Sequence, residues 1–96
     1  MSYKLQIGPQ IHAFQATVGP QSRREIKHAI KELAREHGDI RALRDNLSGW
    51  HRLKIGHYRL IFRYTEGQII QCVFLEDRKL VYEIFQTEMG RILGEE

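Results

Sequence analysis

Apolar residues recur every three to four positions in the first third of the chain, after a weakly alternating segment at residues 3–8 that predicts a strand. The first apolar face is formed by Ile11, Phe14 and Val18. Pro9 suits the first turn of this helix, because the backbone N–H that proline lacks has no helical partner there. Gly19 and Pro20 predict where this helix ends.

A second apolar stripe predicts a longer helix directly after the first. It consists of Ile26, Ile30, Leu33 and Ala34. Ser22 has the position of an N-cap, with Glu25 three residues later as in a capping box. His37 and Gly38 predict the end of this helix, since glycine is common just beyond a last turn. The two helices are expected to form a hairpin with a very short link.

After Ser48-Gly49 the apolar period changes from helical to alternating, which predicts strands. We expect them at residues 50–55, 58–64, 69–75 and 80–82. Pairs of turn residues separate them: Gly56-His57, Glu66-Gly67 and Glu76-Asp77. Residues 40–47 are expected to add one or two helical turns before the first of these strands.

The end of the chain, to about Leu93, is expected to be helical, so the predicted order is β–α–α–β–β–β–β–α in a single domain of residues 1–96. The predicted fold class is α+β, with two N-terminal helices packed on an antiparallel β-meander in a two-layer sandwich. We expect the helices to gather on one face of the sheet and to leave the other face open.

The composition is that of a globular protein, with 42% hydrophobic and 28% charged residues. No apolar run approaches the ~18 residues of a membrane span, and the first residues lack the apolar stretch of a secretory leader, so a cytoplasmic protein is expected. The single cysteine, Cys72, has no partner for an internal disulfide and is expected to be a buried small hydrophobe.

The charge pattern changes this picture more than the net charge of +3 does. Between Trp50 and Tyr64 there are four Lys or Arg residues, two His and no acid. Because side chains alternate along a strand, we expect the basic ones to share a face with a tyrosine from the last strand. This set comprises Arg52, Lys54, Arg59, Arg63, Arg78, Lys79 and Tyr82. Such a face suits phosphate binding, but an ordinary solvent-facing side of an amphipathic sheet has the same pattern, and both interpretations stay open.

No metal site or other cofactor is predicted. The five histidines share no ligand-type spacing: His12, His28, His37, His51 and His57. His51 and His57 flank the basic strand pair, where an imidazole could shuttle protons near neutral pH. The chain also lacks a glycine-rich phosphate loop and a nucleophilic Ser or Cys motif.

Two segments, NLSGWHRLKIGHYRLIF at residues 46–62 and RKLVY at residues 78–82, resemble the signatures of the RelE/ParE superfamily, the toxins of bacterial and archaeal toxin–antitoxin pairs. Residues 46–62 have a leucine and a glycine before an aromatic residue, then a basic alternating strand, Gly-x-Tyr-Arg and an apolar strand. Residues 78–82 are similar to the second signature, a basic residue before a segment that ends in Val-Tyr. The resemblance extends over nearly the whole chain and implies a toxin with two helices followed by a meander.

For a RelE-like member, the resemblance implies a metal-independent, ribosome-dependent mRNA endonuclease in which the RNA 2′-hydroxyl attacks the adjacent phosphate. The catalytic residues would be Lys54, Arg59, Arg78 and Tyr82. Lys54 would bind phosphate and help proton transfer, the two arginines would stabilise the phosphorane, and Tyr82 would orient a base or assist proton transfer. The RNA-binding residues would be His51, Arg52, His57, Arg63 and Lys79.

Two alternatives remain open within the same superfamily. A ParE-like member poisons DNA gyrase without nuclease chemistry, and Gly-x-Tyr-Arg occurs in both groups. A folded but inactive antitoxin-binding relic is the other, and Glu76-Asp77, placed just before Arg78, is the feature that favours it. In every case the implied partner is an antitoxin whose helix and acidic segment cover the basic face. The nuclease alternative adds mRNA and the ribosome as partners, and no membrane partner is expected.

Overall fold

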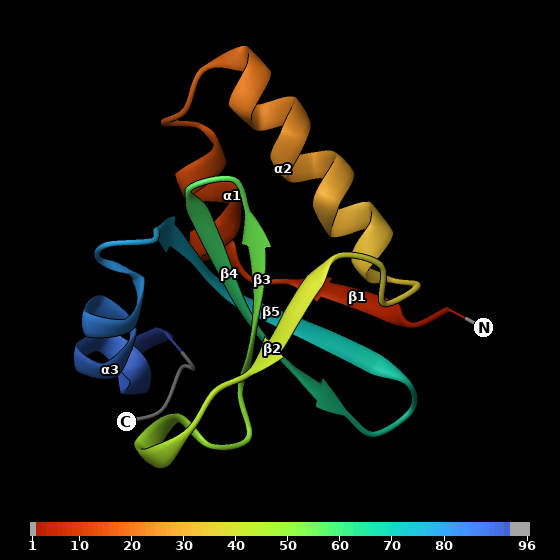
Figure 1. Ribbon diagram of the computed structural model, residues 1–96, viewed down its shortest axis with the longest axis vertical. Coiled ribbons are helices and arrows are strands. Elements are labelled where there is room, and N and C mark those ends of the chain that lie inside the picture. Colours follow the sequence, from red (N-terminus) through yellow and green to blue (C-terminus); the bar gives the residue numbers. More distant parts are fainter. Residues whose placement is uncertain (1, 93–96) are drawn as a thin grey trace.

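The computed structural model describes the backbone of residues 2–92 and the side chains of residues 2–90 (Figure 1). Its elements, in chain order, are β1 (Lys4–Ile7), α1 (Pro9–Gln15), α2 (Pro20–Leu33), β2 (Asp39–Ala42), the 3₁₀ turn η1 (Asp45–Leu47), β3 (His51–Ile55), β4 (Tyr58–Thr65), β5 (Ile69–Asp77) and α3 (Val81–Ile92). The α+β class and the predicted order of strands and helices are confirmed.

The five strands form one mixed sheet in the order β1-β5-β4-β3-β2. From β2 to β5 the neighbours are antiparallel, which confirms the predicted meander. The first strand, β1, lies parallel to β5 at the edge of the sheet, because the α1–α2 hairpin brings the chain back across one face before the meander begins.

A first core lies between the sheet and the α1–α2 hairpin. Its fully buried members include Ile11 from α1, Ile26 and Leu33 from α2, and Leu60 and Phe62 from β4. The apolar stripes predicted for the two helices therefore face the sheet, and Figure 1 shows both helices on the same side of it. Burial of such side chains contributes roughly 1.5–3 kcal/mol each before the entropy cost of folding.

A second core lies on the opposite face of the sheet, under α3. Phe85 is fully buried there, with its ring edge-on to Trp50 at 5.2 Å and tilted against Phe74 at 5.9 Å between centroids. The prediction that this face stays open is therefore wrong for its central part. Ile61 and Phe74 make that part of the sheet apolar, and α3 removes it from water.

The predicted strand at residues 80–82 is wrong, because Val81 begins α3. The turn expected at Glu76-Asp77 is also wrong, since β5 continues through Asp77. Val81 and Phe85 lie one helical turn apart and are both fully buried in the second core. Their packing outweighs the strand propensity of a Leu-Val-Tyr segment.

Three expected helix boundaries also differ. The helical turns expected at residues 40–47 are reduced to the single 3₁₀ turn, because residues 39–42 pair with β3 as strand β2. Gly19, and not Ser22, is the N-cap of α2, and Pro20 occupies its first turn. This helix ends at Leu33, before the expected glycine stop, and Glu36 reverses the chain with a positive φ of 58°.

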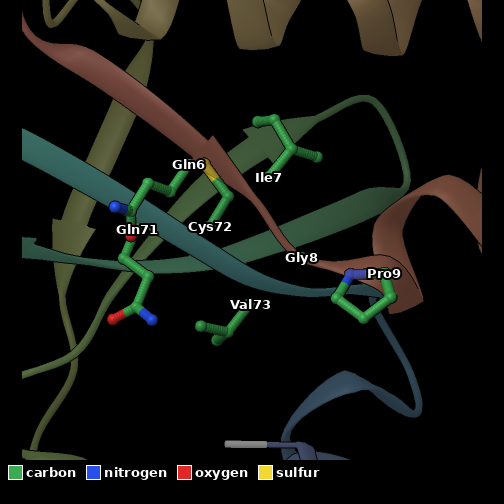
Figure 2. A pocket seen from close by; sticks show the side chains of 7 residues that line it. All are labelled: Gln6, Ile7, Gly8, Pro9, Gln71, Cys72 and Val73. Carbon is green, nitrogen blue, oxygen red and sulfur yellow. The ribbon is translucent and has the colours of Figure 1, made fainter.

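A β-bulge at Val73 changes the alternation along β5. Phe62 lies opposite Cys72, whereas Ile61 lies opposite Phe74, so one residue of β5 is extra. Cys72 belongs to the first core, while Val73 and Phe74 both belong to the second. Figure 2 shows Cys72 on one side of β5 and Val73 on the other. The side chains of β5 after the bulge therefore project from the face opposite to the one that regular alternation would give them.

Two sequence expectations concern burial and membranes. Cys72 is fully buried, as predicted, and desolvation raises the pKa of its thiol to about 12. Among the described helices, none has the length and apolar character to cross a membrane.

Candidate functional site

A row of four charged side chains crosses the antiparallel strands on the α3 face of the sheet. Asp39 lies opposite Lys54, Lys54 opposite Arg59, and Arg59 opposite Glu76. Side chains at directly opposed positions project from the same face, with Cβ atoms about 4.5–5.5 Å apart. We call Asp39, Lys54, Arg59 and Glu76 the cross-strand row.

The connection between β5 and α3 joins the same end of the sheet. The Arg78 N–H donates a 2.8 Å hydrogen bond to the carbonyl oxygen of His57, in the β3–β4 turn. Asp77 holds this connection in shape, because its Oδ1 accepts the Lys79 N–H at 2.9 Å. Both Arg78 and Lys79 are exposed. Tertiary structure thus brings Lys54, Arg59, Arg78 and Lys79 to one place, which we call the basic end.

Arg59 is held against the turn between β3 and β4. Its Nη1 donates to the carbonyl oxygens of Gly56 at 2.8 Å and Tyr58 at 2.9 Å. Gly56 has a φ of 59°, a left-handed conformation that glycine adopts without strain. A guanidinium has five N–H donors, and within residues 2–92 no hydrogen bond uses Nε or Nη2 of Arg59. These donors remain available to an anion at the basic end.

Within the described residues the cations of the basic end form no ion pair, although Asp39 and Glu76 lie beside them in the cross-strand row. Across the described residues, the ion pairs within 4.0 Å involve Glu32 with Arg35 and His37, and Asp39 with Arg52. None of them includes Lys54, Arg59 or Arg78. Three cations with free donors at one end of a sheet form a site that attracts a phosphate or a carboxylate.

Arg52, predicted to bind RNA, lies mostly buried next to the row. Its side chain is 11% exposed, and its Nη1 donates to the Asp39 carbonyl oxygen at 2.7 Å and to Asp39 Oδ1 at 3.2 Å. These bonds tie β3 to the start of β2. Contact with a phosphate would require Arg52 to give up this pairing, so its visible role is to hold the sheet edge.

Arg63 lies on the same face as Arg59 but at the other end of β4. The two are four positions apart along the strand, which is roughly 13 Å. The Arg63 Nε donates to Gln71 Oε1 at 2.7 Å, and its guanidinium carbon lies 4.7 Å from the centre of a Trp50 ring. Arg63 therefore lies on the face that the sequence pattern predicted, but away from the basic end.

The two histidines of the basic segment lie at opposite ends of β3. His57 is exposed in the β3–β4 turn, with its ring 4.3 Å from that of Tyr58, and so lies at the basic end. His51 lies at the start of β3 on the face of the first core, stacked on Phe62 at 5.5 Å and edge-on to Tyr64 at 5.0 Å. Its Nδ1 is buried without a hydrogen-bond partner. A shared role of the two imidazoles at one site is not supported.

Tyr82 follows the basic end in the first turn of α3. It is half-buried and packs against the second core. Val81 beside it is fully buried, so the packing of α3 fixes the backbone position of Tyr82. No hydrogen bond of its hydroxyl occurs within the described part of the chain, so that group is available to a ligand.

A small hollow of about 240 Å³ lies on another part of β5, where β1 turns into α1 (Figure 2). It is lined by Gln6, Ile7, Gly8, Pro9, Gln71, Cys72 and Val73. It holds no cluster of charged groups, and the buried Cys72 thiol is poorly suited to act as a nucleophile because its pKa is raised. For these reasons the basic end is the stronger candidate site.

Two acidic members of this region were not predicted from the sequence. Asp39 lies outside the predicted strands and Glu76 was predicted in a turn, whereas both belong to the cross-strand row. A strand at residues 39–42 is too short and too polar to be detected by alternation. The position of Glu76 depends on the bulge at Val73, which has no clear signal in the sequence. As for metals, no group of three or more His, Cys, Asp or Glu side chains in the described chain is arranged to hold an ion.

Several solved structures have a fold similar to that of this chain. No protein-family model and no curated protein matches the chain. The structure of the archaeal RelE–RelB complex from Pyrococcus horikoshii matches with a TM-score of 0.66 and 22% identity, over 81% of this chain and 97% of that chain. A mutant of the Escherichia coli toxin RelE in the free state matches with a TM-score of 0.70 and 15% identity, over 96% and 99%. The YoeB–YefM complex from Staphylococcus aureus matches with a TM-score of 0.61 and 18% identity, over 79% and 97%.

These matches span almost the full length of the RelE and YoeB chains, and several of those structures contain an antitoxin. They agree with the resemblance of residues 46–62 and 78–82 to the superfamily signatures. The order of three helices and five strands, the mixed sheet and the motif residues all point the same way. The chain therefore has the fold of the RelE and YoeB toxins.

Proposed function

We propose that this chain is the toxin of a toxin–antitoxin pair and acts as a metal-independent, ribosome-dependent mRNA endonuclease in the cytoplasm. The observation that carries the proposal is the basic end, where Lys54 lies directly opposite Arg59, the Arg78 backbone bonds the adjacent β3–β4 turn, and none of the three cations forms an ion pair within the described chain. A fold shared with toxins supports the proposal, and the cations supply its chemistry. The functional unit is the single domain of residues 1–96.

The proposed reaction needs cations more than it needs a metal ion. The RNA 2′-oxygen forms a bond to the adjacent phosphorus, and the bond from phosphorus to the 5′-oxygen of the next nucleotide breaks. Negative charge grows on the non-bridging oxygens of the phosphorane between these events. The free donors of Arg59, with Arg78, are placed to stabilise that charge, and preorganised donors of this kind are typically a large part of catalysis.

Lys54 and Tyr82 have supporting roles in this proposal. Lys54 binds the phosphate and donates a proton to the departing 5′-oxygen. Tyr82, half-buried at the start of α3, presents its ring to a neighbouring base and its hydroxyl to the RNA backbone. His57 and Lys79 extend the contact with RNA at the same end. Arg52 acts indirectly, because it fixes the strand that carries Lys54.

The proposed antitoxin covers the basic end with a helix and an acidic segment. Several structures with this fold were solved together with RelB or YefM. An acidic segment would supply the carboxylates that Lys54, Arg59 and Arg78 lack in the described chain. Neutralisation then follows from competition for the same cations that would bind RNA.

The proposal is tested in a cell-free translation reaction in which messenger RNA ends are mapped by primer extension. Wild-type protein is compared with Arg78→Ala and with Arg24→Ala, which removes an exposed arginine from α2 on the opposite face. We expect new cuts inside translated codons with wild type and Arg24→Ala. Cleavage by Arg78→Ala should fall on the order of 100-fold or more, as for the loss of one transition-state donor.

Intact message and unimpaired translation with wild-type protein would contradict the nuclease proposal. A parallel DNA gyrase supercoiling assay then separates the remaining alternatives. Inhibition there indicates a gyrase poison, and no effect in either assay indicates an inactive antitoxin-binding protein.

A further inference from the structure

We propose that Glu76 is the general base of the cleavage reaction, the group that accepts the proton of the attacking 2′-hydroxyl. This inference rests on the proposed nuclease function and adds a residue to it. Its starting point is the position of Glu76 in the cross-strand row, directly opposite Arg59. An acid among phosphate-binding cations needs a physical explanation, because it opposes the binding of a polyanion.

The β-bulge decides which acid lies in the site. Ile61 pairs with Phe74 in the second core, and Arg59 pairs with Glu76 two residues further along each strand. Glu76 therefore projects from the same face as Arg59 and Lys54, whereas Asp77 alternates to the other face. If the same sequence alternated regularly from Cys72 onward, with no bulge at Val73, Glu76 would project from the face of the first core.

Within the described residues the Glu76 carboxylate forms no structural ion pair. A cross-strand bond to Arg59 would be its ordinary role, but Arg59 Nη1 donates to the carbonyls of Gly56 and Tyr58 instead. In the part of the chain that the structure describes, no cation lies within ion-pair distance of Glu76. Its Oε2 accepts the Asp77 N–H at 3.1 Å, and this bond orients the half-buried carboxylate.

The other acids near the basic end already have structural roles. Asp77 Oδ1 accepts the Lys79 N–H, and Asp39 Oδ1 pairs with the mostly buried Arg52. Each of these three acids has one bonded oxygen, but Asp77 projects from the other face and Asp39 is paired with a cation, whereas Glu76 bonds a backbone N–H and lies directly opposite Arg59. A base must be a carboxylate that can still accept a proton, and Glu76 meets this requirement beside the cations that hold the phosphate.

The proposed step balances as follows. The 2′-hydroxyl proton passes to the Glu76 carboxylate as the 2′-oxygen bonds to phosphorus, and Arg59 and Arg78 hold the phosphorane oxygens. The bond from phosphorus to the 5′-oxygen breaks, and that oxygen takes a proton from Lys54. The products are a 2′,3′-cyclic phosphate and a 5′-hydroxyl end, with Glu76 protonated and Lys54 neutral until both exchange protons with water.

Glu76→Gln provides the test, because it keeps the shape of the side chain and removes its charge and basicity. If Glu76 is the general base, cleavage by Glu76→Gln should fall on the order of 10²–10⁴-fold. Affinity for an RNA with a 2′-deoxy nucleotide at the cleavage position, which binds but is not cut, should stay the same or increase. If Glu76 only repels RNA, Glu76→Gln should cleave faster than wild type, because its neutral side chain would strengthen RNA binding.

Two variants control the experiment. Glu66→Gln makes the same charge change in the exposed β4–β5 turn, at the other end of the strands, and should cleave like wild type. Glu76→Asp keeps a carboxylate and should retain part of the activity together with the acidic limb of the pH–rate profile, which Glu76→Gln should lose. Thermal unfolding followed by circular dichroism checks that each variant is folded.

The failures of the two proposals are distinguishable. If wild type cleaves and Glu76→Gln cleaves as fast or faster with an unchanged pH profile, Glu76 is not the base and the nuclease proposal stands. If wild-type protein does not cleave with ribosomes present, the nuclease proposal is overturned and the assignment of Glu76 with it.

Discussion

At the residue scale, Arg52 is the one charged side chain that is buried among the residues whose side chains the structure describes. Its sequence context gives it the appearance of a phosphate ligand, because it alternates with Lys54 on a basic strand. In the fold its guanidinium bonds Asp39. The two residues are 13 positions apart in the chain, so the sequence pattern does not show that they meet. A buried charge of this kind is retained where its hydrogen bonds are satisfied, and here they join two strands.

Replacement of Arg52 separates a structural role from a direct one. We expect Arg52→Ala to lower the free energy of unfolding by about 1–3 kcal/mol, through the lost hydrogen bonds and the lost packing of its stem. Asp39→Ala should cost about 1 kcal/mol or less, because Asp39 is 52% exposed and the bond to the backbone carbonyl survives. Urea unfolding followed by circular dichroism measures both.

Arg41→Ala is the matched control, since it removes an exposed arginine from the adjacent strand β2 and should change stability by no more than about 0.5 kcal/mol. Equal stability of Arg52→Ala and Arg41→Ala would rule out the structural role of Arg52.

At the element scale, α3 shows how packing overrides local preference. The segment Leu80-Val81-Tyr82, where α3 begins, has the composition of a strand, but β1 and β4 already occupy both sides of β5, so no further strand can pair there. A helix lets Val81 and Phe85 enter the second core together. The same packing places Tyr82 next to the basic end, so the position of a candidate site residue depends on aromatic contacts elsewhere in the helix.

Phe85→Leu tests that dependence with a small change of volume. We expect a loss of about 1–2 kcal/mol in the free energy of unfolding, because the ring contacts to Trp50 and Phe74 disappear. Gln86→Ala, on the exposed side of α3, should stay within about 0.5 kcal/mol of wild type. Chemical denaturation provides the comparison, and a Phe85→Leu protein as stable as wild type would mean that α3 is not held by this aromatic cluster.

At the scale of the whole molecule, the net charge of +3 matters less than its distribution. Acidic side chains pair with cations on α2 and at the start of β2, while Lys54, Arg59 and Arg78 have no such pairs in the described chain. RNA bound at the basic end releases counterions for each phosphate that these cations neutralise. Binding should therefore weaken steeply as salt concentration rises.

Lys79→Ala tests the salt dependence of RNA binding quantitatively. Affinity for the 2′-deoxy RNA, measured by fluorescence anisotropy at several salt concentrations, should show a log–log slope that is smaller by about 0.7 for the variant, the value for one single-stranded phosphate contact. Arg24→Ala removes the same charge from the opposite face and should leave the slope unchanged. Equal slope changes in the two variants would contradict a localised binding site.

Much of the fold followed from local patterns. The apolar stripes of α1 and α2, the three long strands of the meander and the burial of Cys72 were all predicted. The motif residues brought together at the basic end were also predicted, except that Arg63, His51 and Arg52 proved to lie elsewhere or to be engaged in structural contacts. These three residues alternate correctly along their strands, but alternation does not reveal which neighbour a side chain meets.

The class of fold and the identity of the basic residues could be predicted from the chain alone, because hydrophobic period, turn residues and short motifs are local properties. Three features became known only from the folded arrangement: α3 covers the second face, Arg52 pairs with Asp39, and Glu76 lies opposite Arg59. Each of these depends on strand register or on contacts between distant segments. The clearest case is the single extra residue at Val73, which moves every later side chain of β5 to the other face and thereby brings a carboxylate among the cations.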